Sequence, residues 1–279
     1  KLSRKWGNPQ GKTEIIGFSG GFHGRTYAPL SVMDRPLYKD GMEPFLTNTE
    51  VLPFNDSVAL RKAVNHNTCA LALEFLQGEG GVTSATAEFV ETIEELRREY
   101  GFLLIADEVQ AGGGRTGTFF GYQHHGIQPD IVTMAKAIGG GLPLGAMLAR
   151  EDVAQVWKSG MHGTTYGGNA LSCVAGLVVL EELKNGVIDN VNQIGEYLKH
   201  ELSKLKIEFP TMILELRGRG LMQGIVVNGE ALPFVTALLS RGVIANATAG
   251  NVIRLLPPLT ITKGDVDEFI GHLREVIAS

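Results

Sequence analysis

Short apolar runs separated by polar and glycine-rich turns make up the first half of this chain. The β-rich run at residues 13–19 and the continuous apolar runs at 69–75, 102–106 and 130–134 predict buried strands, because strands covered on both faces show no polar alternation. Residues 86–98 predict an amphipathic helix, with Phe89, Ile93 and Leu96 on one face. Strands alternating with helices at this spacing predict a mostly parallel sheet.

The second half follows a different order. Helical patterns at residues 170–184 and 189–205 lead to two strands, 213–217 and 221–227, joined by Gly218-Arg219-Gly220. A helix at 232–239, a strand at 251–258 and a final helix at 262–277 follow, with Thr262 as the N-cap candidate. We therefore expect an α/β chain with a large domain at residues 1–168 and a smaller C-terminal α+β domain at residues 169–279.

Some segments between these elements also carry a prediction. Residues 56–64 read as a helix and residues 143–149 as an apolar return strand. Residues 34–48 are polar, contain two prolines and show no periodicity, so we expect a surface loop there. Glu74 interrupts an apolar run, and a buried carboxylate needs a partner.

Charged side chains follow two of the predicted buried strands. Asp107 comes directly after the run 102–106, and Lys136 follows the run 130–134. In a parallel sheet, ligands bind at the carboxyl ends of the strands. Ala135, Ala137 and Ile138 flank the lysine, and an apolar setting lowers the pKa of an amine and leaves it nucleophilic.

An aspartate and an amine at adjacent strand ends suit pyridoxal phosphate. The lysine forms a Schiff base with this cofactor, and the aspartate keeps the pyridine nitrogen protonated, so that the ring withdraws electrons. Gln110 lies three residues past Asp107, close enough to hydrogen-bond the ring hydroxyl. From the pattern alone, a surface ion pair or a satisfied helix cap remains an alternative for Asp107 and Lys136.

Composition narrows the class of protein. The 279 residues are 44% hydrophobic, which is enough for a large core. The net charge of −5, without long runs of either sign, argues against nucleic-acid binding. Cys69 and Cys173 lie in apolar segments and are expected to be core residues in a reducing compartment. No apolar stretch is long enough to span a membrane.

No metal site is expected either. His124 and His125 are adjacent, and neighbouring residues of a strand point to opposite faces. No cysteine or glutamate cluster with ligand spacing lies nearby. The glycine runs at 112–114 and 139–141 are not P-loops, because no Lys-Ser or Lys-Thr follows them.

Several motifs occur in an order that resembles the class III aminotransferases, and the resemblance extends over essentially the whole chain. Besides the Lys136 segment with its glycines, they are Gly24-Arg25-Thr26, Gln77-Gly78-Glu79-Gly80, Asp107-Glu108-Val109-Gln110, Gly114-Arg115-Thr116-Gly117, Pro129-Asp130-Ile131, Gly163 to Asn169 and Arg217 to Met222. The chain is most similar to the acetylornithine-type members. The resemblance implies a fold-type-I, pyridoxal-phosphate-dependent transferase in which Lys136 is catalytic.

The resemblance also implies cofactor contacts. It places Phe22 or His23 against the ring face, with Phe22 preferred, since aromatic rings stack on a pyridine in an offset geometry. Core packing is the alternative for Phe22. Thr165 would bind the cofactor phosphate of a neighbouring subunit, which makes a homodimer part of the active site. The loop around Thr165 precedes a predicted helix, so a capped helix start is the alternative interpretation of this loop, and both interpretations can hold together.

Substrate contacts follow from the same resemblance. Arg25 would bind the distal carboxylate of the substrate, and Thr164 is assigned to the substrate as well. Arg254 stands alone in an apolar row, where burying an unpaired cation is costly, so it must meet an anion. In the family, the residue matching Arg254 binds the α-carboxylate and pairs with the residue matching Glu79. A solvated turn residue is the alternative for Glu79.

The function implied is transamination of N2-acetylornithine with 2-oxoglutarate, giving a semialdehyde and glutamate, in cytoplasmic arginine biosynthesis. Ornithine, succinylornithine and 4-aminobutyrate remain open as donors. An aminomutase or racemase on the same scaffold is one rival. Another is a cofactor-free chain that only dimerises or binds a partner, because the family's Gly/Ser/Thr-rich phosphate loop does not precede the first helix. We therefore expect this chain alone to bind the cofactor poorly.

Overall fold

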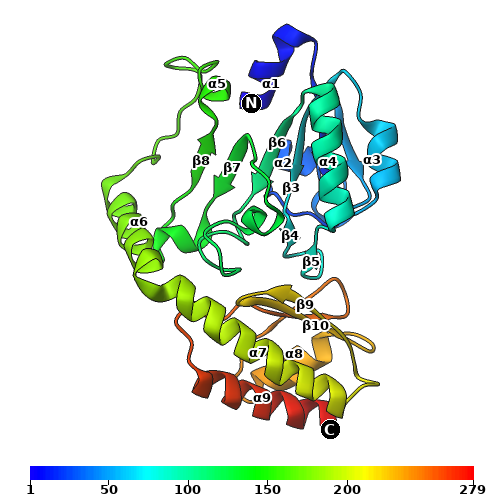
Figure 1. Ribbon diagram of the computed structural model, residues 1–279, viewed down its shortest axis with the longest axis vertical. Coiled ribbons are helices and arrows are strands. Elements are labelled where there is room, and N and C mark those ends of the chain that lie inside the picture. The colour runs from blue at the N-terminus through cyan, green and yellow to red at the C-terminus, as the bar shows by residue number, and fades with distance from the viewer. The chain divides into compact units, whose positions relative to one another are not determined.

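The structure is a computed structural model that describes residues 1–279 (Figure 1). It contains two compact units, which are described separately. Unit 1 comprises residues 1–75, 85–110 and 122–180, and unit 2 comprises residues 76–84, 111–121 and 181–279. The change of unit at Leu180 lies beyond the predicted domain boundary after Gly168, and two short loops of the N-terminal half group with unit 2. Which domain residues 169–180 act with stays a prediction.

A six-stranded sheet forms the centre of unit 1, in the order β2-β1-β3-β6-β7-β8. Five strands are parallel, and β8 runs antiparallel to β7 at the edge, as expected of a return strand. The strands are β1 (Glu14–Phe18), β2 (Thr49–Leu52), β3 (Thr68–Leu73), β6 (Leu103–Asp107), β7 (Ile131–Met134) and β8 (Ala146–Ala149). The predicted strands are confirmed, whereas β2 was not predicted, because its short run alternates without a clear apolar face.

Helix α4 (Ala87–Tyr100) packs its apolar stripe against this sheet. Thr86 caps the helix by accepting a hydrogen bond from the backbone N–H of Phe89, and Gly101 ends it in the left-handed conformation. The ring of Phe89 meets Phe18 of β1 edge to face, with 5.3 Å between the centroids. The other helices of unit 1 are α1 (Leu2–Gly7), α2 (Tyr27–Ser31), α3 (Ser57–Ala63), α5 (Glu151–Ala154) and α6 (Ala170–Glu182), whose last two residues belong to unit 2.

A buried carboxylate fixes the strands that carry the predicted site. Asp130 precedes β7, is 2% exposed and accepts a 2.8 Å hydrogen bond from the backbone N–H of Leu104 in β6. Its oxygens also meet Arg97 of α4, at 2.7 Å, and Arg150, which follows β8. One side chain therefore links β6, β7, β8 and α4, and two guanidinium groups compensate the cost of burying its charge.

Unit 2 is built on a four-stranded antiparallel sheet in the order β11-β12-β10-β9. The strands are β9 (Ile213–Arg219), β10 (Met222–Val227), β11 (Asn246–Thr248) and β12 (Val252–Leu255), with α7 (Ile188–Glu208), α8 (Leu232–Leu239) and α9 (Lys263–Ala278) as helices. Buried side chains of α7, α9 and the sheet form one core, including Leu202, Ile225, Ile253 and Leu273. The hairpin β4 (Leu76–Gln77)–β5 (Thr83–Ser84) belongs to this unit. The predicted strand pair and helices are confirmed.

The Arg-Gly-Arg-Gly motif closes the turn between β9 and β10. Gly218 has φ +99°, and a Cβ there would lie 2.0 Å from the carbonyl oxygen of Met222. Only glycine fits such a conformation beside a neighbouring strand. Arg115 donates from Nη1 to the carbonyl oxygens of Leu221 and Pro257, and burial lowers its pKa to about 10. The two motifs therefore stabilise the same end of the small sheet.

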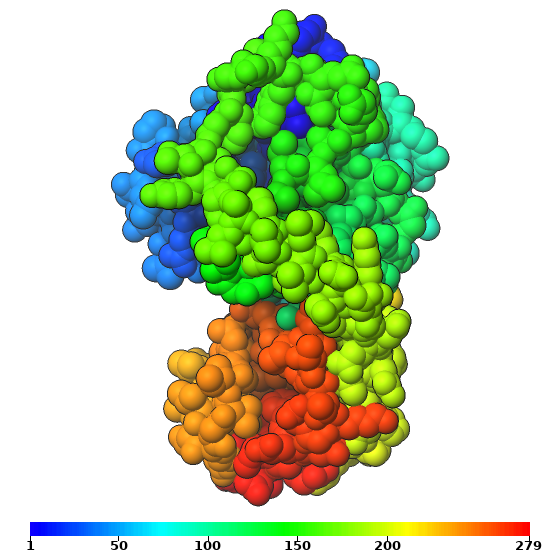
Figure 2. All heavy atoms as spheres, turned by 90° about the vertical axis from the view of Figure 1, so that its left-hand side faces the viewer, coloured from blue at the N-terminus to red at the C-terminus, as the bar shows by residue number.

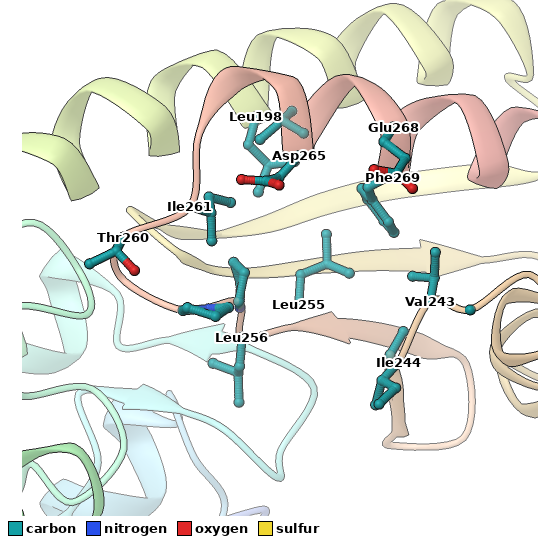
Figure 3. A pocket seen from close by; sticks show the side chains of 15 residues that line it. Leu198, Val243, Ile244, Leu255, Leu256, Thr260, Ile261, Asp265, Glu268 and Phe269 are labelled. Carbon is teal, nitrogen blue, oxygen red and sulfur yellow. The ribbon is translucent and has the colours of Figure 1, made fainter. Parts of the chain in front are cut away.

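A pocket of about 580 Å³ lies in unit 2, and none of the predicted site residues lines it (Figure 3). Its walls are mainly apolar and come from α7, α9, the end of β12 and the segment before β11. They include Leu198, Ile244, Leu255 and Phe269. The pocket contains no lysine, arginine or histidine, so it offers no group for the predicted chemistry.

No helix of the chain has the length and apolar character needed to span a bilayer.

Candidate active site

The carboxyl ends of β6 and β7 bring Asp107 and Lys136 to the same edge of the sheet. The two strands are parallel neighbours, and Asp107, the last residue of β6, is in register with Thr133. Strand β7 ends at Met134, and Lys136 begins the short 3₁₀ helix Lys136–Gly139 directly beyond it. This arrangement follows from the parallel order of the strands, and it is the one that the apolar runs predicted.

The backbone of Lys136 has an unusual conformation. Its φ is +51°, a left-handed value that is uncommon for residues other than glycine. Strained backbone of this kind persists where the surroundings hold it and clusters at functional sites. The prediction that apolar side chains surround Lys136 is wrong for the single chain. Lys136 and Ala137 are exposed, and of the two residues that follow the lysine only Ile138 is buried.

His23 lies against Asp107. The Nδ1 atom of His23 is 2.8 Å from Oδ2 of Asp107, and both side chains are largely buried, at 9% and 12% exposure. Burial alone would lower the pKa of His23, but the hydrogen bond and the negative charge of Asp107, with Glu74 adding to them, raise it above its ordinary value. The carboxylate of Asp107 therefore favours the protonated form of the imidazole.

Phe22 is fixed by its backbone. Its N–H donates to Oε2 of Glu74, 3.0 Å away, so the buried Glu74 has the partner that the sequence required. The half-buried Phe22 ring meets Tyr38 edge to face, with centroids 6.0 Å apart. Gln110 follows β6 in the same unit and is half-buried.

The second predicted group lies within unit 2. Nη1 of Arg254 donates to Oε1 of Glu79 over 2.7 Å, and Nη2 donates to Oδ1 of Asn246 over 2.9 Å. The Arg254 side chain is 9% exposed and that of Glu79 is 34% exposed. Thr248 also donates a hydrogen bond to the carbonyl oxygen of Glu79, which fixes the turn that carries this carboxylate. The roles of Arg254 and Glu79 towards substrates stay predictions.

Thr164 and Thr165 lie in the exposed segment before α6. The helix is capped by Asn169, whose Oδ1 accepts a 2.9 Å hydrogen bond from the N–H of Ser172. The capped helix start expected at the end of this loop is therefore confirmed, and the phosphate role of Thr165 stays a prediction. A Cβ at Gly167 would lie 2.2 Å from Cγ2 of Thr164, so this loop also depends on a glycine.

Arg25 is exposed, and its guanidinium lies over the ring of Tyr38, with Cζ 4.1 Å from the ring centroid. Tyr38 and Asn246 were missed by the sequence analysis. Asn246 could have been found only from its register opposite Arg254, and no signal in the sequence indicates the contact of Tyr38 with Arg25. His124 and His125 lie in a 3₁₀ helix, Gly121–His125, and the strand geometry assumed for them is wrong. No group of three or more His, Cys, Asp or Glu residues could hold a metal ion.

The residues of unit 1 fit pyridoxal phosphate. Lys136 provides an exposed amine for the aldehyde of the cofactor, and Asp107 at the neighbouring strand end provides a carboxylate for its ring nitrogen. In addition, Nε2 of His23 is buried without a hydrogen-bond partner, a polar atom that the chain leaves unsatisfied. The sheet topology, the lysine and the aspartate together define a pyridoxal-phosphate-dependent transferase.

Comparison with known proteins gives the family. The pattern of the class-III aminotransferases matches residues 1–277, and the chain belongs to this family. The predicted family, fold and enzyme class are thereby confirmed, and the family implies pyridoxal phosphate as the cofactor.

Individual relatives carry related names. The chain is 41% identical over 279 residues to acetylornithine aminotransferase of Aquifex aeolicus, covering 99% of this chain and 72% of that protein. It is 40% identical over 284 residues to ornithine aminotransferase 1 of Staphylococcus saprophyticus, covering 99% and 71%. An ornithine aminotransferase structure from Toxoplasma gondii superposes with a TM-score of 0.93 at 30% identity, covering 99% of this chain and 68% of that one.

Proposed function

We propose that this chain transfers an amino group from N2-acetylornithine to 2-oxoglutarate, giving a semialdehyde and glutamate, as a step of cytoplasmic arginine biosynthesis. The observation that carries the proposal is the placing of Lys136 and Asp107 at the carboxyl ends of adjacent parallel strands. The names of relatives such as the Aquifex aeolicus protein favour acetylornithine as the donor. Ornithine is the second candidate, because an ornithine aminotransferase is 40% identical to this chain.

Pyridoxal phosphate, when bound, supplies an aldehyde carbon and an electron-withdrawing ring that no side chain can replace. Lys136 would hold the aldehyde through Nζ, and Asp107 would accept a hydrogen bond from the protonated ring nitrogen. Phe22 and His23 would contact the ring, Gln110 its hydroxyl, and Thr165 the phosphate. The Nζ amine of Lys136 would also act as the base that takes the proton from the carbon bearing the substrate nitrogen and later gives that proton up.

Arginines would orient both substrates. Arg254 binds an α-carboxylate and Arg25 a distal one, since a planar guanidinium matches a carboxylate with two parallel hydrogen bonds. Thr164 adds a substrate contact. Glu79 already neutralises Arg254 in this structure, so a substrate carboxylate must displace it. Because the Glu79 carboxylate and a substrate carboxylate would bind Arg254 in turn, the same arginine could bind amino donors and oxo-acid acceptors of different length.

We also propose that the active unit is a homodimer. Leu171, Val174, Leu177 and Val178 of α6 are 54–71% exposed and recur at helical spacing along one face. Helix α6 and strand β8 lie on the side of unit 1 that Figure 2 turns towards the viewer, drawn in green to yellow-green. Such an exposed apolar face marks an interaction site, and the exposed Thr165 just before α6 would then serve a second copy.

Addition of pyridoxal phosphate tests the proposal directly. Because this chain alone is expected to bind the cofactor poorly, the cofactor is added in excess. The wild-type chain should then show a shifted cofactor absorbance and form one glutamate per N2-acetylornithine consumed, whereas Lys136→Ala should show neither. Lys62→Ala, which removes an exposed lysine of α3, is the matched control and should behave as wild type. Identical spectra for wild type and Lys136→Ala would reject the assigned lysine. Comparing ornithine, succinylornithine and 4-aminobutyrate in the same assay fixes the donor.

A further inference from the structure

The guanidinium of Arg25 rests on an aromatic ring and not on a carboxylate. Its Cζ lies 4.1 Å from the centroid of Tyr38, within the range of a cation–π interaction. Arg25 forms no ion pair or hydrogen bond within the chain, although a guanidinium carries five N–H donors. This contact holds the guanidinium over the ring without using its N–H donors, which leaves them free for a ligand.

Hydrogen bonds fix the segment around Tyr38 at three points. Tyr38 ends the 3₁₀ helix Pro36–Tyr38, and its backbone N–H donates to the carbonyl oxygen of Arg35 over 3.0 Å. Arg35 in turn donates to the carbonyl oxygen of Gly20, 2.8 Å away, which ties this loop to the segment that follows β1. Lys39 donates to the carbonyl oxygen of Met33 over 2.9 Å. The loop expected at residues 34–48 is therefore anchored beside Phe22 and Arg25.

The Tyr38 side chain thus contacts two predicted site residues, Phe22 and Arg25. It meets the Phe22 ring edge to face, with an interplanar angle of 80°, and the Arg25 guanidinium lies over its face. Phe22 is proposed to contact the cofactor ring and Arg25 the substrate carboxylate. Because Tyr38 lies against both side chains, it influences the position of Arg25 relative to Phe22.

We propose that Tyr38 is a positioning residue for substrate specificity: it orients Arg25 so that the enzyme selects donors with a carboxylate remote from the reacting amine. The proposal rests on the proposed function and adds a residue to it. The contact is the aromatic face and not the hydroxyl group, so phenylalanine can replace tyrosine, whereas an aliphatic side chain cannot.

Two donors separate this role from a general effect on folding. N2-acetylornithine carries the remote carboxylate, and N-acetyl-1,4-diaminobutane is the same molecule without it. In Tyr38→Leu, KM for N2-acetylornithine should rise about two- to fivefold with kcat unchanged, the range expected for an exposed cation–π contact. The kcat/KM for N-acetyl-1,4-diaminobutane should stay the same, and Tyr38→Phe should match wild type with both donors.

Three results would overturn the proposal. A lower KM for N2-acetylornithine in Tyr38→Leu would mean that the ring holds Arg25 away from the substrate. An equal loss with both donors would mean that Tyr38 only supports the fold, and no change would mean that stacking does not orient Arg25.

Calorimetric titration of glutarate, a dicarboxylate without amine or oxo group, keeps this test independent of turnover. Its Kd should rise about two- to fivefold in Tyr38→Leu and stay unchanged in Tyr38→Phe. If the wild-type chain binds glutarate in this way but does not transaminate, the proposed function fails and the role of Tyr38 stands. Undetectable glutarate binding, or equal binding by both variants, overturns the role of Tyr38.

Discussion

His23 and Asp107 form a buried pair in which Nδ1 of the imidazole lies 2.8 Å from Oδ2 of the carboxylate. The second oxygen, Oδ1, accepts a hydrogen bond from the backbone N–H of Val109 over 3.1 Å. Both oxygens of Asp107 are thus fixed, and the carboxylate cannot rotate freely. A carboxylate oriented in this way is preorganised for a ligand at the sheet edge.

The first prediction concerns the titration of His23. Because Asp107 raises the pKa of His23 despite its burial, NMR titration should give a midpoint above the ordinary value of 6.5. In Asp107→Asn the negative charge is gone, burial dominates, and the midpoint should fall. A folded pKa above the unfolded one contributes stability that is complete below about pH 6.5 and is lost as pH rises through the folded pKa. An unchanged midpoint in Asp107→Asn would contradict this account.

Glu79→Gln should strengthen binding of carboxylate substrates. The glutamine keeps the shape of the side chain but no longer competes as a charge for Arg254, whose Nη1 lies 2.7 Å from the Glu79 carboxylate. The Glu79 side chain is 34% exposed, so solvent screens the pair, and KM for 2-oxoglutarate should fall only about two- to fivefold. Steady-state kinetics decide this, and a higher KM would show that Glu79 does not compete.

Asn246→Ala should act in the opposite direction. Asn246 is a neutral acceptor for Nη2 of Arg254, so it orients the guanidinium without neutralising it. Loss of a hydrogen bond to a charged group should raise KM for 2-oxoglutarate about tenfold, with kcat nearly unchanged. Asn251→Ala, in the turn between β11 and β12, is a control of the same residue type. Equal effects of the two variants would assign Asn246 a purely structural role.

Asp130→Asn should destabilise the fold. Asparagine keeps the shape but removes the buried counter-charge of Arg97, whose side chain is 16% exposed and keeps only the more exposed Glu94 as an ionic partner. The free energy of unfolding should decrease by about 3 kcal/mol in urea titrations, the range for breaking a buried ion pair. Asp152→Asn is the matched control, because Asp152 also pairs with Arg150 but is 61% exposed, and it should change stability little. Similar losses in both variants would contradict the special role of Asp130.

Leu177→Glu should dissociate the proposed homodimer. The side chain is 65% exposed on the apolar face of α6, and a buried carboxylate without a partner opposes association. Sedimentation should then give a monomer, with circular dichroism unchanged. Val58→Glu, 78% exposed on α3 outside that face, should remain a dimer. If Leu177→Glu also remains a dimer, the interface does not include α6.

The sequence predicted the parts of this molecule that depend on local pattern. Continuous apolar runs located β3, β6 and β7, and therefore the strand ends that carry Asp107 and Lys136. Thr262, proposed as an N-cap, forms a full capping box with Asp265. These features depend on residues close together along the chain, which periodicity can report.

Other features depend on tertiary contacts that no local pattern reports. Asp130 meets Arg97 and Arg150 only because α4 and β8 converge on β7. The contact of Asn246 with Arg254 requires the register of β11, a strand too short to predict. Tyr38 lies in a polar segment without periodicity, and nothing in that segment indicates the stacking on Arg25.

The left-handed backbone of Lys136, with φ +51°, limits what can replace it. A β-branched residue would clash with its own backbone there, so loss of function in such a variant would mix misfolding with the missing amine. Glycine would relax the local geometry and relieve about 1–2 kcal/mol of the strain that a side chain carries in this conformation. Only residues that tolerate a left-handed backbone can therefore replace Lys136 without disturbing the loop. The lysine itself destabilises this loop, because its side chain is held in a conformation that glycine would adopt more readily.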